Sequence, residues 1–135
     1  MNINIKRVYE PACADDGARI LVDRLWPRGL SKADAKIDLW LKELAPSNEL
    51  RRWYSHDPTK WSTFRDRYFA ELASDDSGID ELLPWLRWGK VTFLYASKEA
   101  RLNNAAALRE YLAEHLQQGS LGGDGGGFGG FGGDE

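Results

Sequence analysis

The sequence contains a single cysteine, Cys13, among its 135 residues. One thiol cannot close a disulfide within the chain, and it cannot supply the cysteine pairs of a zinc site. Proteins of oxidising compartments that depend on disulfides carry many more cysteines. The cysteine content therefore excludes a disulfide-stapled domain and a cysteine-rich metal domain, and no metal ligands are expected.

Long apolar runs are also absent. No stretch approaches the ~20 apolar residues with which a helix spans a bilayer. The first residues, 1–7, lack the apolar core of a secretory signal. We therefore expect a soluble, cytoplasmic protein with no membrane partner.

The sequence lacks the short motifs that indicate a cofactor or a known reaction. There is no phosphate-binding loop, no dinucleotide glycine pattern after a strand, no His-Glu-x-x-His and no serine nucleophile elbow. No cofactor is therefore implied. The sequence predicts a fold and a location for a site, and it names no reaction.

Glycine is scarce in most of the chain, since ten of the fourteen glycines follow Gln118. A segment so rich in glycine cannot bury enough apolar surface to offset the entropy lost on ordering. We therefore expect one folded domain over residues 1–117 and a disordered, acidic Gly/Phe-rich tail over residues 118–135. All 18 Lys and Arg precede this tail, which holds three of the 21 acidic residues, so the body is neutral. A neutral body argues against a general nucleic-acid binder.

The pattern that is present indicates a mixed fold. Apolar or alternating segments predict strands, and apolar residues at intervals of three and four predict helices. Strands separated by helical crossovers predict a single compact α/β domain, with a small central sheet of about three or four strands covered by helices. The predicted strands are 2–9, 19–26 and 91–96, and residues 37–41 are predicted to be a further strand or a helix, with the strand favoured. The predicted helices follow Ser31, Pro46-Ser47, Asp57-Pro58, Gly78 and Asn103 or Asn104, and Pro84 predicts a kink or a second helix start.

Three charged residues, Asp23, Arg24 and Arg28, lie at or just after the carboxyl end of the strand predicted for residues 19–26. In open α/β sheets, ligands bind beyond the carboxyl ends of the strands. A guanidinium presents a planar fork suited to phosphate or carboxylate. Arg24 and Arg28 are therefore candidate anion ligands, with Asp23 orienting them or acting as a base. The alternative is a structural ion pair that fixes the strand to the following turn.

Other polar residues join this site if the strand over residues 91–96 is a parallel neighbour. Ser97 and Lys98 follow that strand, and Asn104 stands at the start of the last helix, where backbone N–H groups favour anions. Histidine is the side chain most often used as an acid or base at neutral pH, so His56 is a candidate for that role, or else a loop residue beside a helix cap. The candidate catalytic residues are thus Asp23 and His56, and the candidate ligand-binding residues are Arg24, Arg28, Ser97, Lys98 and Asn104.

Several segments resemble a known family. The matching segments are residues 5–9, 16–29, 40–47 and 50–58, followed by Trp61, Phe64, Arg67-Tyr68, Glu71-Leu72, Asn104-Ala105 and Leu108. Over residues 3–116 the chain resembles the YeaO-like branch of DUF488, a bacterial and archaeal family of unknown function. The resemblance implies a compact α/β domain and no particular activity. Wider relatives can carry a cysteine near the end of the late strand, whereas this chain reads Tyr95-Ala96-Ser97-Lys98 there, so thiol chemistry is not supported.

Three functions remain open from the sequence. The first is binding or processing of a small anionic ligand, phosphorylated or carboxylated, at residues 23–28. The second is a nucleic-acid-binding or regulatory module, which is supported by the position of Arg51 and Arg52 beside aromatic residues. The third is a protein-interaction domain anchored by Trp85 and Trp88, which do not both fit the apolar stripe of their helix.

Overall fold

A computed structural model describes residues 1–116, and the predicted tail lies outside the described residues. Its centre is a four-stranded parallel sheet with the order β1-β4-β2-β3. The predicted α/β class and sheet size are confirmed. The strands are β1 (Ile3–Arg7), β2 (Ala18–Leu21), β3 (Leu39–Trp40) and β4 (Val91–Tyr95).

The sequence prediction for the second strand was too long. β2 ends at Leu21, not at Trp26, although the Val22 N–H still donates to Leu94 O. Beyond that point side chains replace the strand partners, because Asn104 donates to Val22 O and the Trp40 indole donates to Asp23 O. With its carbonyl groups satisfied in this way, the chain leaves the sheet without exposing unpaired polar groups.

Two helices begin at the capping serines that the sequence predicts, whereas α3 and α4 begin without a side-chain cap. Ser31 and Ser47 accept hydrogen bonds from the N–H groups of Asp34 and Leu50, and each hydroxyl satisfies a donor that the first helical turn leaves free. Of the two alternatives predicted for Pro84, the second helix start is wrong, because the fourth helix passes through Pro84 as a single element. The helices are α1 (Lys32–Ala35), α2 (Asn48–Tyr54), α3 (Trp61–Ser74), α4 (Ser77–Trp88) and α5 (Asn104–Leu116), with 3-10 turns η1 (Ala14–Asp16), η2 (Lys42–Leu44) and η3 (Pro58–Lys60).

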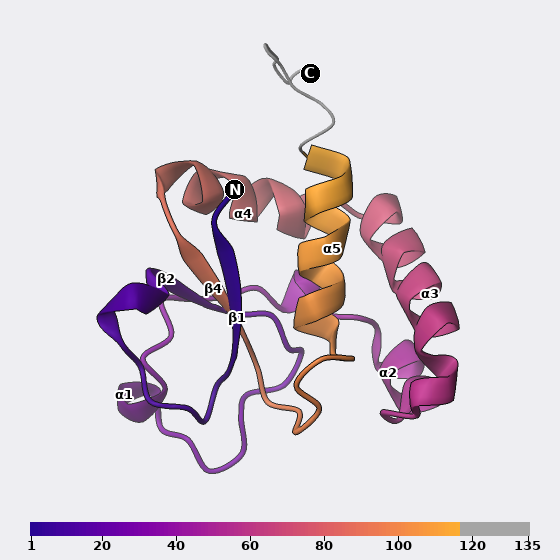
Figure 1. Cartoon of the computed structure of the whole chain (residues 1–135), viewed down its shortest axis with the longest axis horizontal. Coiled ribbons are helices and arrows are strands. Elements are labelled where there is room, and N and C mark those ends of the chain that lie inside the picture. Colours follow the sequence, from indigo (N-terminus) through magenta and orange to yellow (C-terminus); the bar gives the residue numbers. More distant parts are fainter. Residues whose placement is uncertain (117–135) are drawn as a thin grey trace.

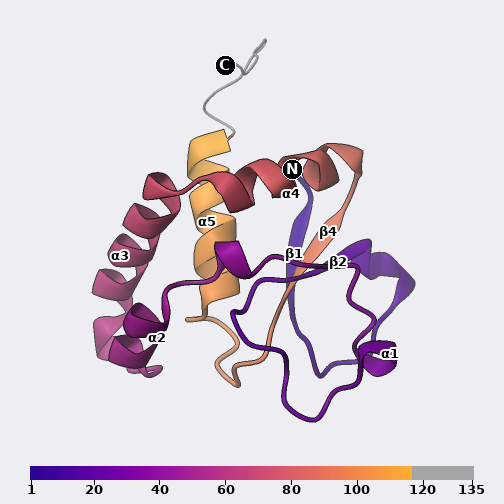
Figure 2. The same cartoon turned by 180° about the vertical axis from the view of Figure 1, so that it is seen from behind.

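The two faces of the sheet are covered differently. Helices α2, α3 and α5 lie on one side, and α1 with its flanking loops lies on the other (Figures 1 and 2). Residues such as Ile20 and Phe93 pack toward the helices in the larger core cluster. Leu21 and Leu94 form a smaller cluster, against which Trp26 and Trp40 pack. The sheet is therefore buried on both faces, as expected for parallel strands.

A buried charge network closes the amino-terminal side of β2. Arg19 Nη1 lies 2.6 Å from Asp16 Oδ2, and its Nε and Nη2 donate to the carbonyl groups of Lys36 and Ala35. Lys6 Nζ lies 3.1 Å from Asp16 Oδ1. Burial acts to raise the pKa of Asp16, but hydrogen bonds from Cys13, Lys6 and Arg19 outweigh it and hold the pKa below its ordinary range.

Gly17 offers a test of the turn into β2. Its φ is +63°, and an added Cβ would lie 2.2 Å from Lys90 O. Since that contact involves backbone on both sides, Gly17→Ala is expected to lower the free energy of unfolding by about 2–4 kcal/mol, from left-handed strain plus the clash. Gly29 has a φ of +82° with nothing within 4 Å, so Gly29→Ala should cost only about 1–2 kcal/mol. Urea unfolding of both variants measures the difference, and equal losses would contradict the role given to Lys90.

Candidate functional site

Because all four strands are parallel, their carboxyl ends meet at one edge of the sheet. The loop from β4 to α5 and the first turn of α5 lie at the same edge (Figure 1). A cavity of about 350 Å³ opens there. Its lining comes from residues 23–28 after β2, residues 96 and 97 after β4, and residues 103 and 104 at the start of α5. It is completed by Tyr9, Ala45, Pro46, Arg51, Tyr54, His56 and Phe64.

Asp23 is held by both of its neighbours across the strand ends. Its Oδ2 accepts the Ala96 N–H at 2.8 Å, and its Oδ1 accepts the Asn104 side-chain amide at 3.1 Å. Burial raises the pKa of the Asp23 carboxyl above its ordinary value of 3.8, while these two hydrogen bonds and the charges of Arg51 and His56 act to lower it. Asp23 thus joins β2, β4 and α5 at the cavity wall.

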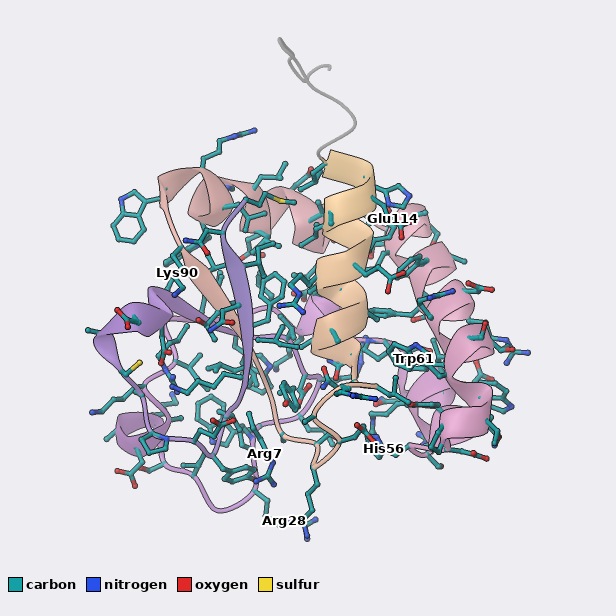
Figure 3. All side chains as sticks on the ribbon, viewed as in Figure 1. Arg7, Arg28, His56, Trp61, Lys90 and Glu114 are labelled. Carbon is teal, nitrogen blue, oxygen red and sulfur yellow. The ribbon has the colours of Figure 1, made fainter. Side chains whose placement is uncertain are left out.

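The three cavity arginines differ in how they are held. Arg24 is half-buried, and its Nε and Nη2 donate to the carbonyl groups of Pro46 and Ala45 at 3.3 Å. Arg51 is exposed on α2 and makes one side-chain hydrogen bond, to Asn48 at 3.3 Å. Arg28 makes no side-chain hydrogen bond or ion pair within residues 1–116, and it extends away from the body at the rim (Figure 3).

These contacts answer the question that the sequence left open about Asp23. Among the described residues, Asp23 forms no ion pair with Arg24 or Arg28, so the proposed structural ion pair and the orienting role are both wrong. In a regular strand, the adjacent residues Asp23 and Arg24 would point to opposite faces. Both line the cavity, because β2 has already ended at Leu21.

His56 and Ser97 face each other across the cavity mouth. The His56 Nδ1 lies 3.5 Å from the Ser97 Oγ, which also accepts the Glu99 N–H. His56 has a φ of +56° and Ser55 a φ of +45°, so two consecutive residues adopt left-handed backbone where α2 ends. Such backbone is uncommon outside glycine and asparagine, and it turns the imidazole toward the end of β4.

The first turn of α5 closes the site. Asn103 Oδ1 accepts the Ala106 N–H and so caps the helix, whereas the Asn104 amide is used by Val22 and Asp23. Asn103 is therefore the residue that caps α5, and Asn104 is the residue that contacts the end of β2. Asn104 is a positioning residue for Asp23, and the amino end of α5 is directed toward the cavity.

The predicted site residues come together with one exception, Lys98, and the prediction missed one cavity residue, Arg51. Asp23, Arg24, Arg28, His56, Ser97 and Asn104 all line the cavity. Lys98 is exposed and does not line it, because the loop turns away after Ser97. Arg51 was not among the predicted ligand-binding residues, although the sequence marked it beside aromatic residues. Its position one helical turn before the buried Tyr54 was the available signal.

The charged residues of β1 have structural partners. Arg7 Nε donates to the carbonyl groups of Ala96 and Ser97 at 3.2 and 3.1 Å, and so fixes the loop after β4. Tyr9 lies under the Arg7 guanidinium, and its hydroxyl donates to Arg28 O at 2.7 Å. Arg7 and Tyr9 therefore hold the two exit loops that carry Ser97 and Arg28.

Aromatic residues near Arg51 and Arg52 are already occupied. Trp53 packs beneath Arg67 and Lys60, with distances of 4.5 and 5.1 Å to the ring centroid. Tyr54 is buried and stacks on Phe64 at 4.3 Å. Both aromatic side chains are therefore engaged by neighbouring residues of the same molecule. On α4, Trp85 packs on the core and Trp88 is 79% exposed.

The pKa of the Asp23 carboxyl depends on the charged residues that line this cavity. Because the Arg51 charge lowers the pKa of Asp23, Arg51→Ala is expected to raise that pKa further. Folding favours the protonated carboxyl, so the contribution of Asp23 to stability is largest below pH 3.8 and is lost as the pH rises through the raised pKa. A ¹³C titration of the carboxyl carbon measures both effects. An Asp23 midpoint that is unchanged in Arg51→Ala would contradict this geometry.

Fold and cavity together define a parallel α/β domain with a cationic pocket at the strand exits. The chain belongs to the DUF488 family, since the model described as the inactive DUF488-N3 subclade matches residues 2–126. It is 45% identical over 112 residues to the uncharacterized protein YeaO of Escherichia coli, covering 83% of this chain and 97% of that protein. It is 40% identical over 110 residues to uncharacterized proteins of Mycobacterium bovis and Mycobacterium tuberculosis, covering 82% of this chain and 92% of each.

The family assignment confirms the resemblance read from the sequence. No solved structure matches the chain significantly. Within residues 1–116, no helix is long and apolar enough to cross a membrane.

Proposed function

We propose that the cavity at the exits of β2 and β4 binds a small anionic ligand that carries a phosphate or carboxylate group. The observation that supports this most is the gathering of Arg24, Arg51 and His56 around one cavity of about 350 Å³, with Arg28 at its rim. A volume of this size accommodates a small metabolite. Guanidinium groups are the side chains best suited to hold its oxyanion.

Each cationic group has donors available. Arg24 Nη1 makes no hydrogen bond within residues 1–116, while its Nε and Nη2 are anchored, so the guanidinium is oriented before a ligand arrives. Arg51 would have to give up only its hydrogen bond to Asn48 in order to bind a ligand. Arg28 is exposed at the rim, and its side chain would have to turn toward the cavity in order to contact a bound anion.

The carboxylate of Asp23 is compatible with an anion nearby. Both of its oxygens already accept hydrogen bonds, from Ala96 and Asn104. A bound anion would raise the pKa of Asp23 further, and the protonated carboxyl then becomes a hydrogen-bond donor. In this proposal Asp23 holds a proton beside the ligand, and the imidazole of His56 lies beside Ser97 at the cavity mouth.

Binding is favoured over turnover. The matching subclade is described as inactive, and Ser97 stands near the strand end where wider relatives can carry a cysteine. The Ser97 hydroxyl also accepts the Glu99 N–H and so has a structural use in the loop after β4. The proposed function is thus a cytoplasmic anion-binding protein, and Asp23 and His56 are binding residues in it.

A thermal-shift panel at fixed ionic strength tests this proposal. Inorganic phosphate and phosphorylated or carboxylated metabolites are compared on the wild type, Arg28→Ala and Lys98→Ala. A ligand at about 100 times its dissociation constant stabilises the fold by about 2.7 kcal/mol, which raises the melting temperature by several degrees. Arg28→Ala should retain the baseline stability and lose part of this rise.

Lys98→Ala is the matched control, because it removes an exposed cation beside the site that does not line the cavity. It should respond as the wild type does. An equal rise in all three proteins would assign the effect to general screening, and no rise with any anion would reject the proposed function.

A further inference from the structure

A second cavity, of about 480 Å³, lies between β1 and α5 and shares no lining residue with the anion pocket. We refer to it as the β1–α5 groove. Its apolar lining comes from Ile3 on β1, Leu102 before α5, Ala106 and Ala113 on α5, and Trp61 on α3. Trp61, Ile3 and Leu102 are half-buried, so the groove is a continuation of the core that remains open to solvent.

The margin of the groove carries unpaired positive charge. Arg101 and Arg109 are exposed, and within residues 1–116 neither guanidinium has an acidic partner. The one acidic residue in the lining, Glu110, lies 3.4 Å from Arg65. The occupant that fits this groove is therefore apolar and acidic.

The chain itself contains such a segment immediately after α5. Residues 117–135 include no lysine or arginine, and they carry Phe128 and Phe131 together with Asp124, Asp134 and Glu135. The groove residues Ala106, Arg109, Glu110 and Ala113 stand on the helix that this segment follows. Phe128 lies twelve positions after Leu116, a reach of up to about 40 Å. The groove extends along a helix of about 20 Å, so Phe128 reaches any part of it.

We propose that residues 117–135 fold back and occupy the β1–α5 groove of the same molecule. Phe128 and Phe131 cover the apolar floor at Ile3 and Trp61, and the acidic residues pair with Arg101 and Arg109. Attachment at α5 gives the segment a millimolar effective concentration, so contacts too weak for a free peptide suffice. The glycines let the backbone approach α5 closely.

The test compares ¹H–¹⁵N spectra of the full chain with those of Phe128→Ser/Phe131→Ser. Both substitutions lie outside the folded body, so loss of folding is not at issue. The amides of Ile3, Leu102, Ala106 and Ala113 and the indole of Trp61 are expected to shift in the variant, and the amides at Asp23, Arg51 and His56 to stay in place. Arg109→Glu should reproduce the groove shifts, and Arg87→Glu, an exposed arginine of α4, should not.

Four outcomes would overturn the proposal. One is superposable spectra, with heteronuclear NOE values of an unfolded chain throughout residues 117–135. A second is shifts confined to the anion pocket, which would assign the segment to that site instead. A third is groove shifts that depend on protein concentration, which would make the occupant a second copy. The fourth is equal shifts in Arg87→Glu and Arg109→Glu.

Discussion

Arg19→Met is expected to lower the free energy of unfolding by about 3–5 kcal/mol, the cost of breaking a buried ion pair by removing one partner. Arg19 is 5% exposed and lies 2.6 Å from Asp16. The substitution also leaves the carbonyl groups of Ala35 and Lys36 without their donors. For a domain of this size, the melting temperature should fall by more than about 10 °C.

Arg65→Met is the matched control for this loss. Arg65 also has an acidic neighbour, Glu110 at 3.4 Å, but both side chains are a third or more exposed. Exposed pairs contribute about 0–1 kcal/mol, so this variant should unfold near the wild-type temperature. Comparable losses in the two variants would show that the network around Asp16 does not anchor β2.

The same network predicts a dependence on acid. Because the pKa of Asp16 is held low in the folded protein, its contribution to stability is present above the ordinary pKa of 3.8 and is lost as the pH falls toward the depressed value. Urea unfolding between pH 5 and pH 2 should show stability falling in the wild type. Asp16→Asn should flatten this part of the profile, and a profile as steep as that of the wild type would assign the acid loss to other carboxyl groups.

Arg51→Glu is expected to weaken binding of the anion selected by the thermal-shift panel by about tenfold to a hundredfold or more. Hydrogen bonds to charged groups contribute about 1.5–3 kcal/mol, and the added carboxylate repels the ligand. Arg51 is exposed, and its one side-chain hydrogen bond is to Asn48, so the fold should be unaffected. Calorimetric titration at constant ionic strength measures the change.

Arg52→Glu provides the control for charge alone. Arg52 is the next residue of α2, is equally exposed and does not line the cavity. Arg52→Glu changes the net charge by the same amount as Arg51→Glu, but solvent and salt screen the new charge from the ligand. The affinity of this variant should stay within about threefold of the wild type. If Arg51→Glu and Arg52→Glu weaken binding equally, Arg51 acts through the long-range electrostatic field of the protein and does not contact the anion.

The sequence predicts the location of the site because local signals fix it. Apolar runs identify β2 and β4, capping side chains identify the starts of α1, α2 and α5, and parallel pairing of β2 with β4 then brings Asp23, Ser97 and Asn104 together. The strand and helix signals depend on residues that are close in sequence. The pairing itself was an assumption that the sheet order confirms.

What the sequence does not predict depends on distant contacts. The end of β2 is set by the indole of Trp40 and the amide of Asn104, which no pattern near Leu21 encodes. Arg51 reaches the cavity because α2 crosses the strand exits, a matter of helix placement. Lys98 looked equivalent to Ser97 by position, yet the turn fixed by Arg7 separates them. Binding residues that tertiary packing selects are therefore the ones that sequence reasoning misses.

The most direct test of the central claim is a crystal of the protein soaked in tungstate, a tetrahedral oxyanion that scatters anomalously. Bound in the proposed pocket, tungstate should give an anomalous peak between Arg24, Arg51 and His56, and the peak should disappear from crystals of Arg51→Glu. A peak beside Arg101 and Arg109 alone, or no peak in the cavity at concentrations that saturate the thermal shift, would contradict an anion site at the exits of β2 and β4.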